Sequence, residues 1–358
     1  MSKKIVMTGG GTAGHVTPNI ALIPSLLEEG YEIFYIGSYN GIEKKLLADY
    51  NVNYYGIASG KLRRYFDPKN FSDPFRVIKG FFQSFRILGK IKPDVVFSKG
   101  GYVSVPVVRA ASLRRIPCII HESDMTPGLA NRLCIKHAWK VCCNFPETLS
   151  SLPSDKAVLT GSPIRKELSE GNKEKGLALC GFDGSKPVIL VIGGSLGAQA
   201  VNECVREAMP QLMDTYDIIH LCGTGKMDNM LLTKPGYKQF EYVKDDLKDL
   251  YAACDVVISR AGANAICELL CLKKPNILIP LPAKSSRGDQ ILNAGSFEKQ
   301  GFSIVIREEE LDSELLKNKV DELYKDLQSY IDNMNKCRQR DAIGTIISLI
   351  NEAADLGK

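Results

Sequence analysis

The sequence lacks long apolar runs, a strong charge of either sign, and paired metal-ligating residues. None of its apolar runs approaches the roughly 18 residues that a membrane-spanning helix needs. The net charge of the 358 residues is +5, a surplus too small to indicate a nucleic-acid surface. The chain contains no Cys-x-x-Cys and no Asp-x-Asp, so we expect no metal site. The eleven cysteines, an odd number, are expected to be structural thiols in a reducing compartment.

Short apolar runs alternate with helical patterns along both halves of the chain. Hydrophobic residues make up 44% of it, as in an ordinary globular protein, and its length suggests about two domains. The alternation predicts an α/β fold of two doubly wound parallel sheets, each opening with a strand, a glycine turn and a helix. Strands are expected at 5–7, 33–36, 95–97, 118–120, 188–192, 218–221, 256–258, 277–279 and 303–306.

The strand pattern restarts after the polar stretch 169–175, which is the best linker candidate. We therefore expect an N-terminal domain at 1–165 and a second domain at 166–338. The last segment, 339–358, is expected to form a helix that could pack back on the N-terminal domain.

The first glycine loop runs from Gly9 to His15, between a strand and a helix. Glycines let the backbone approach a phosphate, and the helix N-terminus offers free N–H groups. The Gly-x-Gly-x-x-Gly spacing also fits an NAD-dependent oxidoreductase, but the acid expected at the end of the second strand is absent at Gly37-Ser38, which weakens that alternative. His15, where the helix begins, is well suited to take a proton near neutral pH.

The second half opens with a similar loop, Gly193 to Gly197. Its Gly-x-Ser-x-Gly spacing would suit the nucleophile of a hydrolase, with His220 as the only histidine downstream of Ser195. Little room remains between these two residues for the acid of a triad, so Ser195 is better interpreted as a donor to a phosphate.

Two further strand–glycine–helix turns follow, one in each half. The turn 98–104 gives the first half a second helix end that favours anions, and the two such ends together favour a diphosphate ligand. The turn 259–265 leads into a helix carrying Glu268, whose carboxylate is either a ligand for a ribose diol or a solvated side chain.

Segment 73–90 predicts an amphipathic helix. Seven apolar residues from Phe75 to Leu88 occupy one broad arc, and four cations lie on the opposite side. The commoner interpretation packs the apolar arc on the sheet and leaves the cations in water. The alternative is a basic, phenylalanine-rich surface that rests on an anionic membrane.

Seven ordered segments, spread over nearly the whole chain, resemble the MurG family of peptidoglycan glycosyltransferases. They are GGGTAGHVTP at 9–18, KGGYVSVP at 99–106, HESD at 121–124, GSPIR at 161–165, GGSLGA at 193–198, SRAGANAICE at 259–268 and DQILNA at 289–294. The resemblance implies a GT-B fold of two Rossmann-like domains, with the acceptor on the first and UDP-N-acetylglucosamine (UDP-GlcNAc) mainly on the second. It implies inverting transfer of GlcNAc to the 4-hydroxyl of the muramyl sugar of lipid I, the undecaprenyl-diphosphate-linked muramyl-pentapeptide, forming lipid II without a cofactor. A related GT-B transferase with another acceptor, or a nucleotide-sugar binding module, stays an alternative.

The resemblance also implies a role for individual residues, with His15 as the general base. The acceptor is expected at Gly11, Gly100, Gly101 and Tyr102. The donor is expected at Thr12, Ala13, Gly14, Asp124, Arg165, Ser195, Lys244, Ala263, Asn264, Ala265, Ile266, Cys267, Glu268 and Gln290. Implied partners are the cytoplasmic leaflet of the cell membrane, where the protein would be peripheral, and cell-wall or division proteins, but no nucleic acid.

Two positions depart from the family pattern. Asp124 stands where asparagine is usual; an ionised aspartate cannot donate a hydrogen bond, so its contact to the sugar must differ or pass through water. Lys244 stands at the uracil-contacting position, which is often apolar, and there only a backbone contact would survive the change.

Overall fold

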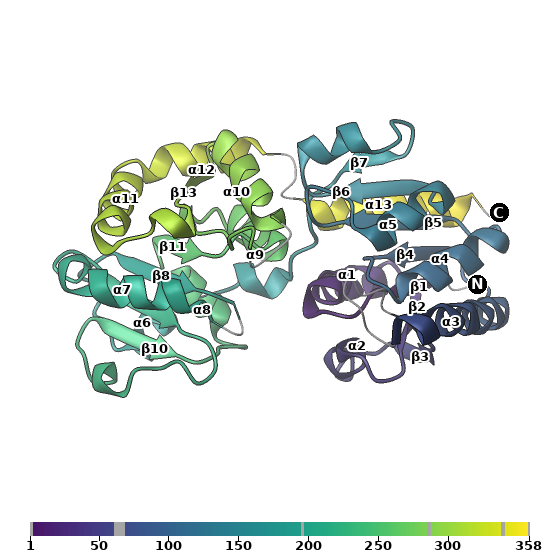
Figure 1. Ribbon diagram of the computed structural model, residues 1–358, viewed down its shortest axis with the longest axis horizontal. Helices are drawn as coiled ribbons and strands as arrows, with labels where there is room; N and C mark the ends of the chain where they lie inside the picture. The colour runs from purple at the N-terminus through teal and green to yellow at the C-terminus, as the bar shows by residue number, and fades with distance from the viewer. Residues whose placement is uncertain (1–2, 61–68, 195–196, 285–287, 338–340, 357–358) are drawn as a thin grey trace. The chain divides into compact units, whose positions relative to one another are not determined.

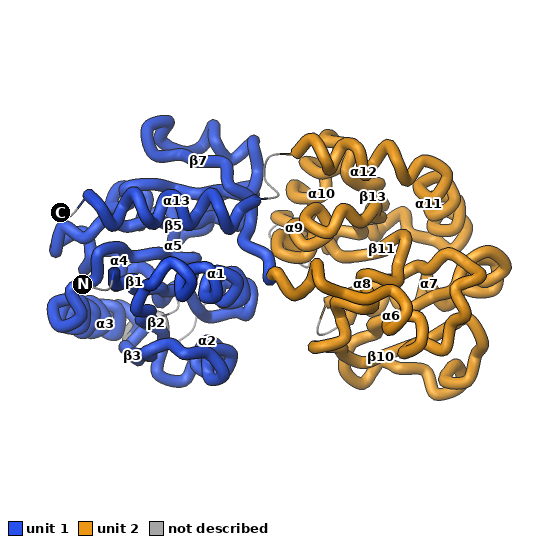
Figure 2. Tube along the Cα trace, turned by 180° about the vertical axis from the view of Figure 1, so that it is seen from behind, with its two compact units in different colours: residues 1–165, 341–358 blue, residues 166–340 orange. Residues whose placement is uncertain are grey.

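The computed structural model describes residues 3–60, 69–194, 197–284, 288–337 and 341–356, which form two compact units (Figures 1 and 2). Unit 1 comprises residues 1–165 and 341–358, and unit 2 comprises residues 166–340. Each unit is an α/β structure built on its own parallel sheet, as the alternation of strands and helices predicts.

The described residues of unit 1 form a seven-stranded parallel sheet in the order β3-β2-β1-β4-β5-β6-β7. Strands β2 and β3 are added on one side of β1, and β4 to β7 are added on its other side, so the strand order reverses between β1 and β4. The strands are β1 (Lys4–Thr8), β2 (Glu32–Ser38), β3 (Asn53–Ile57), β4 (Val95–Ser98), β5 (Cys118–Glu122), β6 (Lys140–Cys143) and β7 (Ala157–Leu159). Its α-helices are α1 (Thr17–Glu28), α2 (Ile42–Leu46), α3 (Lys69–Ile91), α4 (Ser104–Leu113), α5 (Leu129–Cys134) and α13 (Ala342–Asp355).

Both faces of this sheet are buried, because successive side chains of β1 enter different cores. Ile5 and Met7 pack in one core, and Val6 packs in the core on the other face. The C-terminal helix α13, yellow in Figure 1, contributes Ile346 and Ile350 to the first of these cores. The chain thus returns to unit 1 after completing unit 2.

Unit 2 repeats the arrangement with a six-stranded parallel sheet, in the order β10-β9-β8-β11-β12-β13 over the described residues. Its strands are β8 (Val188–Ile192), β9 (Asp217–Leu221), β10 (Tyr237–Phe240), β11 (Val256–Ser259), β12 (Asn276–Leu278) and β13 (Ser303–Val305). Its α-helices are α6 (Lys173–Cys180), α7 (Gln199–Leu212), α8 (Leu247–Ala253), α9 (Ala263–Cys271), α10 (Asp289–Lys299), α11 (Ser313–Lys325) and α12 (Leu327–Lys336).

The nine strands predicted from the sequence are confirmed, while β3, β6, β7 and β10 were not predicted. The linker prediction is wrong: residues 169–175 include the end of a 3-10 helix (Lys166–Ser169) and the first turn of α6, and they belong to unit 2. All eleven cysteines are free thiols and most are buried, as expected of structural residues.

Helix α3 packs only part of its apolar arc on the domain, so the commoner interpretation is confirmed for that part alone. Its buried face carries Gly80, Ser84 and Leu88, because a Cβ at Gly80 would collide with the carbonyl O of Ala58 and glycine alone allows so close an approach. Phe75, Ile78 and Phe82 are instead exposed on the opposite face. Phe81 and Phe85 are partly buried and pack on the core that contains Leu88, so the apolar arc of the helix is divided between a packed side and an exposed side.

Candidate active site

The two glycine loops of unit 1 interlock at the carboxyl edge of its sheet. They follow the adjacent strands β1 and β4, which pair in register at Thr8 and Ser98. Gly101 has a φ of +83°, and a Cβ there would collide with the carbonyl O of Gly10. The structure therefore brings together two loops that are separated by nearly ninety residues in the sequence, and only glycine fits their contact.

The predicted acceptor residues lie at this contact. Gly11 has a φ of +90°, and a Cβ there would lie 2.6 Å from Cε1 of Tyr102. The donor-side residues Thr12 and Ala13 follow in the same loop and are exposed. The backbone and the Tyr102 ring thus shape this edge, and it can receive a polar ligand.

His15 ends a short 3-10 helix, Ala13–His15, and its ring is half-buried. Its Nδ1 lies 3.2 Å from the carbonyl O of Lys99, a residue of the other glycine loop. A carbonyl can only accept, so a neutral His15 ring carries its proton on Nδ1 and its lone pair on Nε2. In that tautomer Nε2 is the ring nitrogen that can take a proton.

A buried carboxylate, which the sequence analysis missed, holds the first loop in place. Glu43 of α2 accepts hydrogen bonds from the Ser38 amide (2.8 Å) and the Ser38 hydroxyl (2.6 Å), and the Gly11 amide lies 3.5 Å from its other oxygen. Glu43 lies five residues after the end of β2, and not at the strand end where a dinucleotide-binding protein places its ribose-binding acid. Here these donors within the fold occupy the carboxylate, so Glu43 organises the loop.

A buried cation lies beside the same loops and was also missed. The Lys99 ammonium, only 1% exposed as a residue, contacts Nδ1 of His121 at 2.8 Å and the Ser123 hydroxyl. Nε2 of His121 lies 2.8 Å from the carbonyl O of Gly161. Burial, followed by the Lys99 charge, holds the pKa of His121 well below its ordinary value, so the neutral ring accepts from Lys99 and donates to Gly161.

The predicted donor residue Asp124 lies in the loop after β5, and Glu122 fixes that loop. The Glu122 carboxylate accepts from the Asp124 amide at 3.1 Å and from the Gly128 amide at 2.9 Å. Burial raises the pKa of Glu122, while these hydrogen bonds lower it. Asp124 is thereby held at the same carboxyl edge of the sheet, half-buried.

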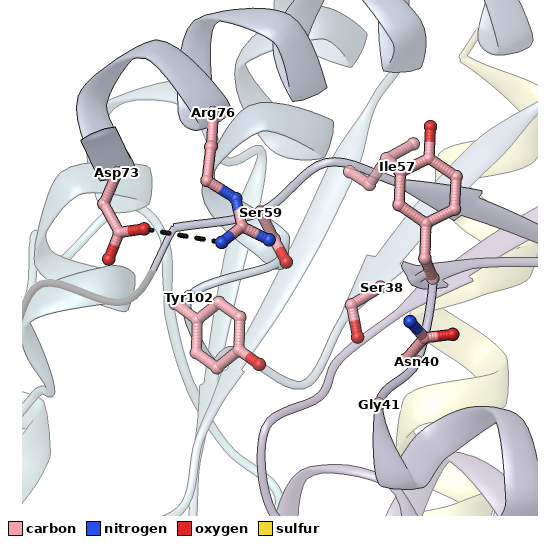
Figure 3. Close-up of a pocket in the computed structure, with 9 residues that line it drawn as sticks. Ser38, Asn40, Gly41, Ile57, Ser59, Asp73, Arg76 and Tyr102 are labelled. Carbon is pink, nitrogen blue, oxygen red and sulfur yellow. Dashed lines mark ion pairs between the residues drawn. The ribbon is translucent and has the colours of Figure 1, made fainter. Parts of the chain in front are cut away.

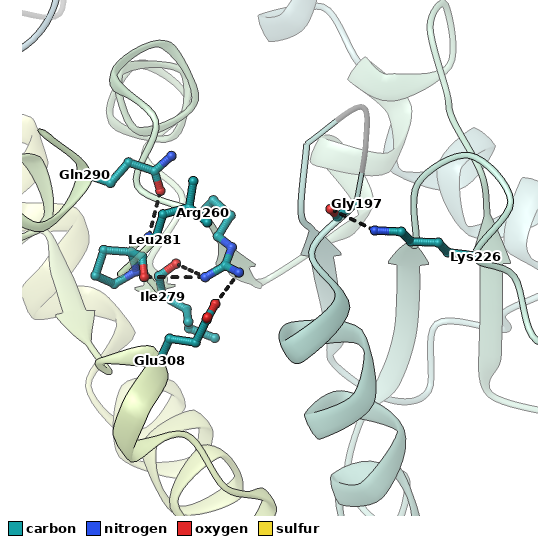
Figure 4. A network of polar contacts seen from close by, with 8 residues as sticks. Gly197, Lys226, Arg260, Ile279, Leu281, Gln290 and Glu308 are labelled. Carbon is teal, nitrogen blue, oxygen red and sulfur yellow. Dashed lines mark hydrogen bonds and ion pairs between the residues drawn. The ribbon is translucent and has the colours of Figure 1, made fainter. Parts of the chain in front are cut away.

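In unit 2 the loop after β8 packs on the end of β9. A Cβ at Gly197 would collide with the carbonyl O of Cys222, and the Lys226 ammonium donates to the Gly197 carbonyl at 3.3 Å (Figure 4). Ser195 lies outside the described residues. Both ring nitrogens of the fully buried His220 are engaged, by Tyr237 and Asn202, so the hydrolase alternative that needed His220 as a base is wrong.

All but one of the other predicted donor residues follow strands of this sheet at its carboxyl ends. On α9, Ala263, Ile266 and Cys267 are buried, while Asn264, Ala265 and Glu268 are partly exposed. Lys244 is exposed in the loop between β10 and α8. Arg165 is the last residue of the first segment of unit 1.

Arg260, which was not predicted as a site residue, connects the loop after β11 to the loop after β12. Its guanidinium donates to the carbonyl O atoms of Ile279 (3.0 Å) and Pro280 (3.4 Å) and pairs with Glu308 (Figure 4). The next residue of the same loop, Leu281, donates its amide to Oε1 of Gln290 at 3.1 Å. Arg260 and Gln290 thus shape the β12–α10 loop beside α9.

In the described part of the chain, no three His, Cys, Asp or Glu side chains gather as they would around a metal ion. Across the same residues, no helix is both long and apolar enough to span a bilayer.

Two parallel sheets with Rossmann-like strand order, each with glycine loops at its carboxyl edge, are characteristic of the GT-B class of glycosyltransferases. Glycosyltransferase family 28 matches the chain twice, with its N-terminal domain over residues 5–143 and its C-terminal domain over residues 188–347. The chain belongs to glycosyltransferase family 28, and its resemblance to the MurG family within it is confirmed by the following relatives.

A protein of Lachnospira eligens is 63% identical over 98% of this chain and 99% of its own length. It is named UDP-N-acetylglucosamine–N-acetylmuramyl-(pentapeptide) pyrophosphoryl-undecaprenol N-acetylglucosamine transferase, as is a Clostridium novyi protein at 59% identity. The crystal structure of Acinetobacter baumannii MurG superposes with a TM-score of 0.77 at 28% identity, over 98% of this chain and 99% of that one. A kitacinnamycin glycosyltransferase shares the fold, with a TM-score of 0.75 at 17% identity, over 99% of this chain and 100% of that one.

Proposed function

We propose that this protein transfers GlcNAc from UDP-GlcNAc to the 4-hydroxyl of the muramyl sugar of lipid I, forming lipid II in peptidoglycan synthesis. The substrates are those in the names of relatives that are 57–63% identical over nearly the whole chain. The observation that carries the chemistry is the His15 ring, oriented by the Lys99 carbonyl beside two interlocked glycine loops.

In the proposed reaction the acceptor oxygen attacks the anomeric carbon of GlcNAc from the face opposite UDP. The bond from that carbon to the diphosphate oxygen breaks, and its electron pair leaves with UDP. Nε2 of His15 takes the proton of the acceptor hydroxyl. Because attack and departure occur on opposite faces, an α-linked donor gives a β-linked product.

The donor residues divide between the units in this proposal. On unit 1, Gly14 and Asp124, with Thr12 and Ala13, border the sugar. The first-turn amides of α9 in unit 2 and the guanidinium of Arg165, which belongs to unit 1, stabilise the charge on departing UDP. Glu268 accepts from the ribose diol, the Lys244 backbone meets the uracil, and Gln290 reaches the sugar.

Unit 1 would also hold the protein on the membrane that contains the acceptor. Phe75, Ile78 and Phe82 are 74%, 55% and 65% exposed, and Lys79 and Arg86 are exposed on the same face of α3. Positions 75, 78, 79, 82 and 86 share one face of a helix with 3.6 residues per turn. Such a stripe fits an interfacial helix that inserts apolar side chains and attracts anionic headgroups. We place this contact at the cytoplasmic leaflet; cell-wall or division partners stay a prediction.

A UDP-release assay tests the reaction. Purified protein is given a panel of nucleotide sugars, with and without a lipid I analogue of short lipid chain. Release of UDP from UDP-GlcNAc only when the analogue is present, with a disaccharide product, is the expected result. Release without the acceptor, or with a different acceptor only, would contradict the proposal.

A further inference from the structure

Unit 1 contains a cavity that the proposed transfer chemistry does not use. It has a volume of about 310 Å³, near the lower end for ligand sites, and opens between the loop after β2, the end of β3 and the first turns of α3 (Figure 3). Its polar wall residues include Ser38, Asn40, Ser59, Asp73, Arg76 and Tyr102.

The cavity shares its walls with the loop predicted to bind the acceptor. Tyr102 lines the cavity, and its ring also packs against Gly11. Ser38 lines it too and donates to Glu43, the carboxylate that holds the Gly11 loop. A ligand bound at the glycine loops can therefore extend directly into the cavity.

The charges in the walls exclude two parts of a lipid-linked sugar. The Asp73 carboxylate is almost fully buried and lies 3.9 Å from the guanidinium of Arg76, whose side chain is 55% exposed. Arg76 is the one cation among the described residues that line the cavity, so a diphosphate would leave two excess negative charges beside Asp73, where a single carboxylate would leave one. A polyprenyl chain would cover hydroxyl, amide and charged groups of the walls with hydrocarbon, which costs free energy.

A peptide fits these walls better. Its backbone offers both N–H donors and C=O acceptors, which match the Asn40 amide and the hydroxyls of Ser38, beside it, and Ser59, near Arg76 (Figure 3). A peptide carboxylate can also form charge-assisted hydrogen bonds to the half-exposed Arg76. We infer that this cavity binds part of the peptide of the acceptor, with a carboxylate of that peptide on Arg76; the inference rests on the proposed function.

Two water-soluble, short-chain acceptors test the inference, one with the pentapeptide and one without any peptide. For the unaltered protein, we expect a lower acceptor KM with the pentapeptide. Arg76→Gln should raise that KM about tenfold, because one charge-assisted hydrogen bond is lost. The KM for the peptide-free acceptor and the KM for UDP-GlcNAc should stay the same. Arg109→Gln, which removes an exposed arginine of α4 away from the cavity, should change none of these values.

A second variant, Asn40→Asp, adds a negative charge to an exposed part of the wall and should raise the same KM without disturbing the fold. If the unaltered protein treats both acceptors alike, or if Arg76→Gln shifts both KM values equally, the inference is wrong while the proposed function stands. If the unaltered protein transfers to neither acceptor, the proposed function itself is wrong.

Discussion

Nδ1 of His15 lies 3.2 Å from the carbonyl O of Lys99. The glycine loop after β4 therefore orients the proposed base, which lies at the end of the glycine loop after β1. The contact uses a main-chain atom, and any side chain at position 99 retains it. What the loops must preserve is their spacing, which the absence of a Cβ at Gly101 allows. The chemistry of His15 therefore depends on backbone geometry across two adjacent strands.

Replacing His15 with glutamine keeps a hydrogen-bonding side chain but removes the group that takes the proton. We expect kcat for UDP release to fall by about 10²–10⁴-fold, the usual contribution of a general base, with little change in the KM for UDP-GlcNAc. His137→Gln, in the short 3-10 helix after α5, is the matched control and should keep full turnover. Near-normal kcat in His15→Gln would remove this residue from the mechanism.

Replacing Lys99 with methionine removes the buried ammonium while approximately keeping the volume. The pKa of His121 should rise, because the Lys99 charge is one cause of its depression, yet stay below the ordinary value because burial is the larger cause. Stability should fall by about 1–3 kcal/mol, since His121 and Ser123 lose a donor. NMR titration of the four histidine rings and urea unfolding measure both effects.

Lys136→Met provides the control for this pair of measurements. Lys136 is exposed in the same unit, and its loss should change neither the His121 titration nor the unfolding midpoint by a comparable amount. An unchanged pKa of His121 in Lys99→Met would show that the two side chains do not interact in solution.

Sequence patterns predicted the strands that are continuous apolar runs, but they missed the shorter and more polar ones. Val188–Ile192 is such a run and lies at the centre of its sheet, so it was recognisable from composition alone. Tyr237–Phe240 reads YKQF and lies at the edge, where one side has no strand partner among the described residues. Its strand conformation is set by pairing with β9, which a local pattern does not contain.

The candidate site shows the same division. Glycine loops are visible in the sequence because backbone approach requires glycine at fixed spacings. Glu43 and Lys99 were not recognised, because a charged residue is ordinarily exposed and only the fold shows that these two are buried against polar partners. The division of the apolar arc of α3 was not predicted for a related reason, because only the fold shows that Gly80 packs against Ala58. That packing leaves Phe75 and Phe82 exposed while Phe81 and Phe85 face the core.

The exposed stripe of α3 predicts salt-sensitive membrane binding. The unaltered protein should co-sediment with vesicles that contain anionic lipid, and binding should weaken as salt screens Lys79 and Arg86. The double variant Phe75→Glu/Phe82→Glu should bind at least tenfold more weakly, because each buried phenylalanine contributes about 1.5–3 kcal/mol. Met230→Glu, at an 87% exposed position of unit 2, is the control and should bind normally. Binding that is absent or insensitive to salt would contradict the prediction.

His220 predicts an acid-sensitive step in the stability of the protein. Its ring is buried in β9, with Nδ1 2.9 Å from the Tyr237 hydroxyl and Nε2 3.0 Å from Oδ1 of Asn202. Burial, followed by the charge of Arg206, lowers the pKa of His220 to about 3. In the unfolded chain the histidine ring is protonated with a pKa near 6.5. Below that pH the unfolded state therefore binds a proton that the folded state does not bind. Stability contributed by the neutral ring is therefore complete above pH 6.5 and is lost, at up to about 1.4 kcal/mol per pH unit, as the pH falls toward 3.

His220→Gln tests this through the pH dependence of unfolding, which a general loss of packing does not imitate. The unfolding free energy in urea, measured from pH 8 to pH 5, should fall less steeply below pH 6.5 in the variant than in the unaltered protein. Above pH 7.5 the two curves should run parallel, separated only by the cost of the substitution, and this range is the internal control. Equal slopes below pH 6.5 would mean that His220 is protonated in the folded protein, which is inconsistent with a neutral ring that accepts from Tyr237 and donates to Asn202.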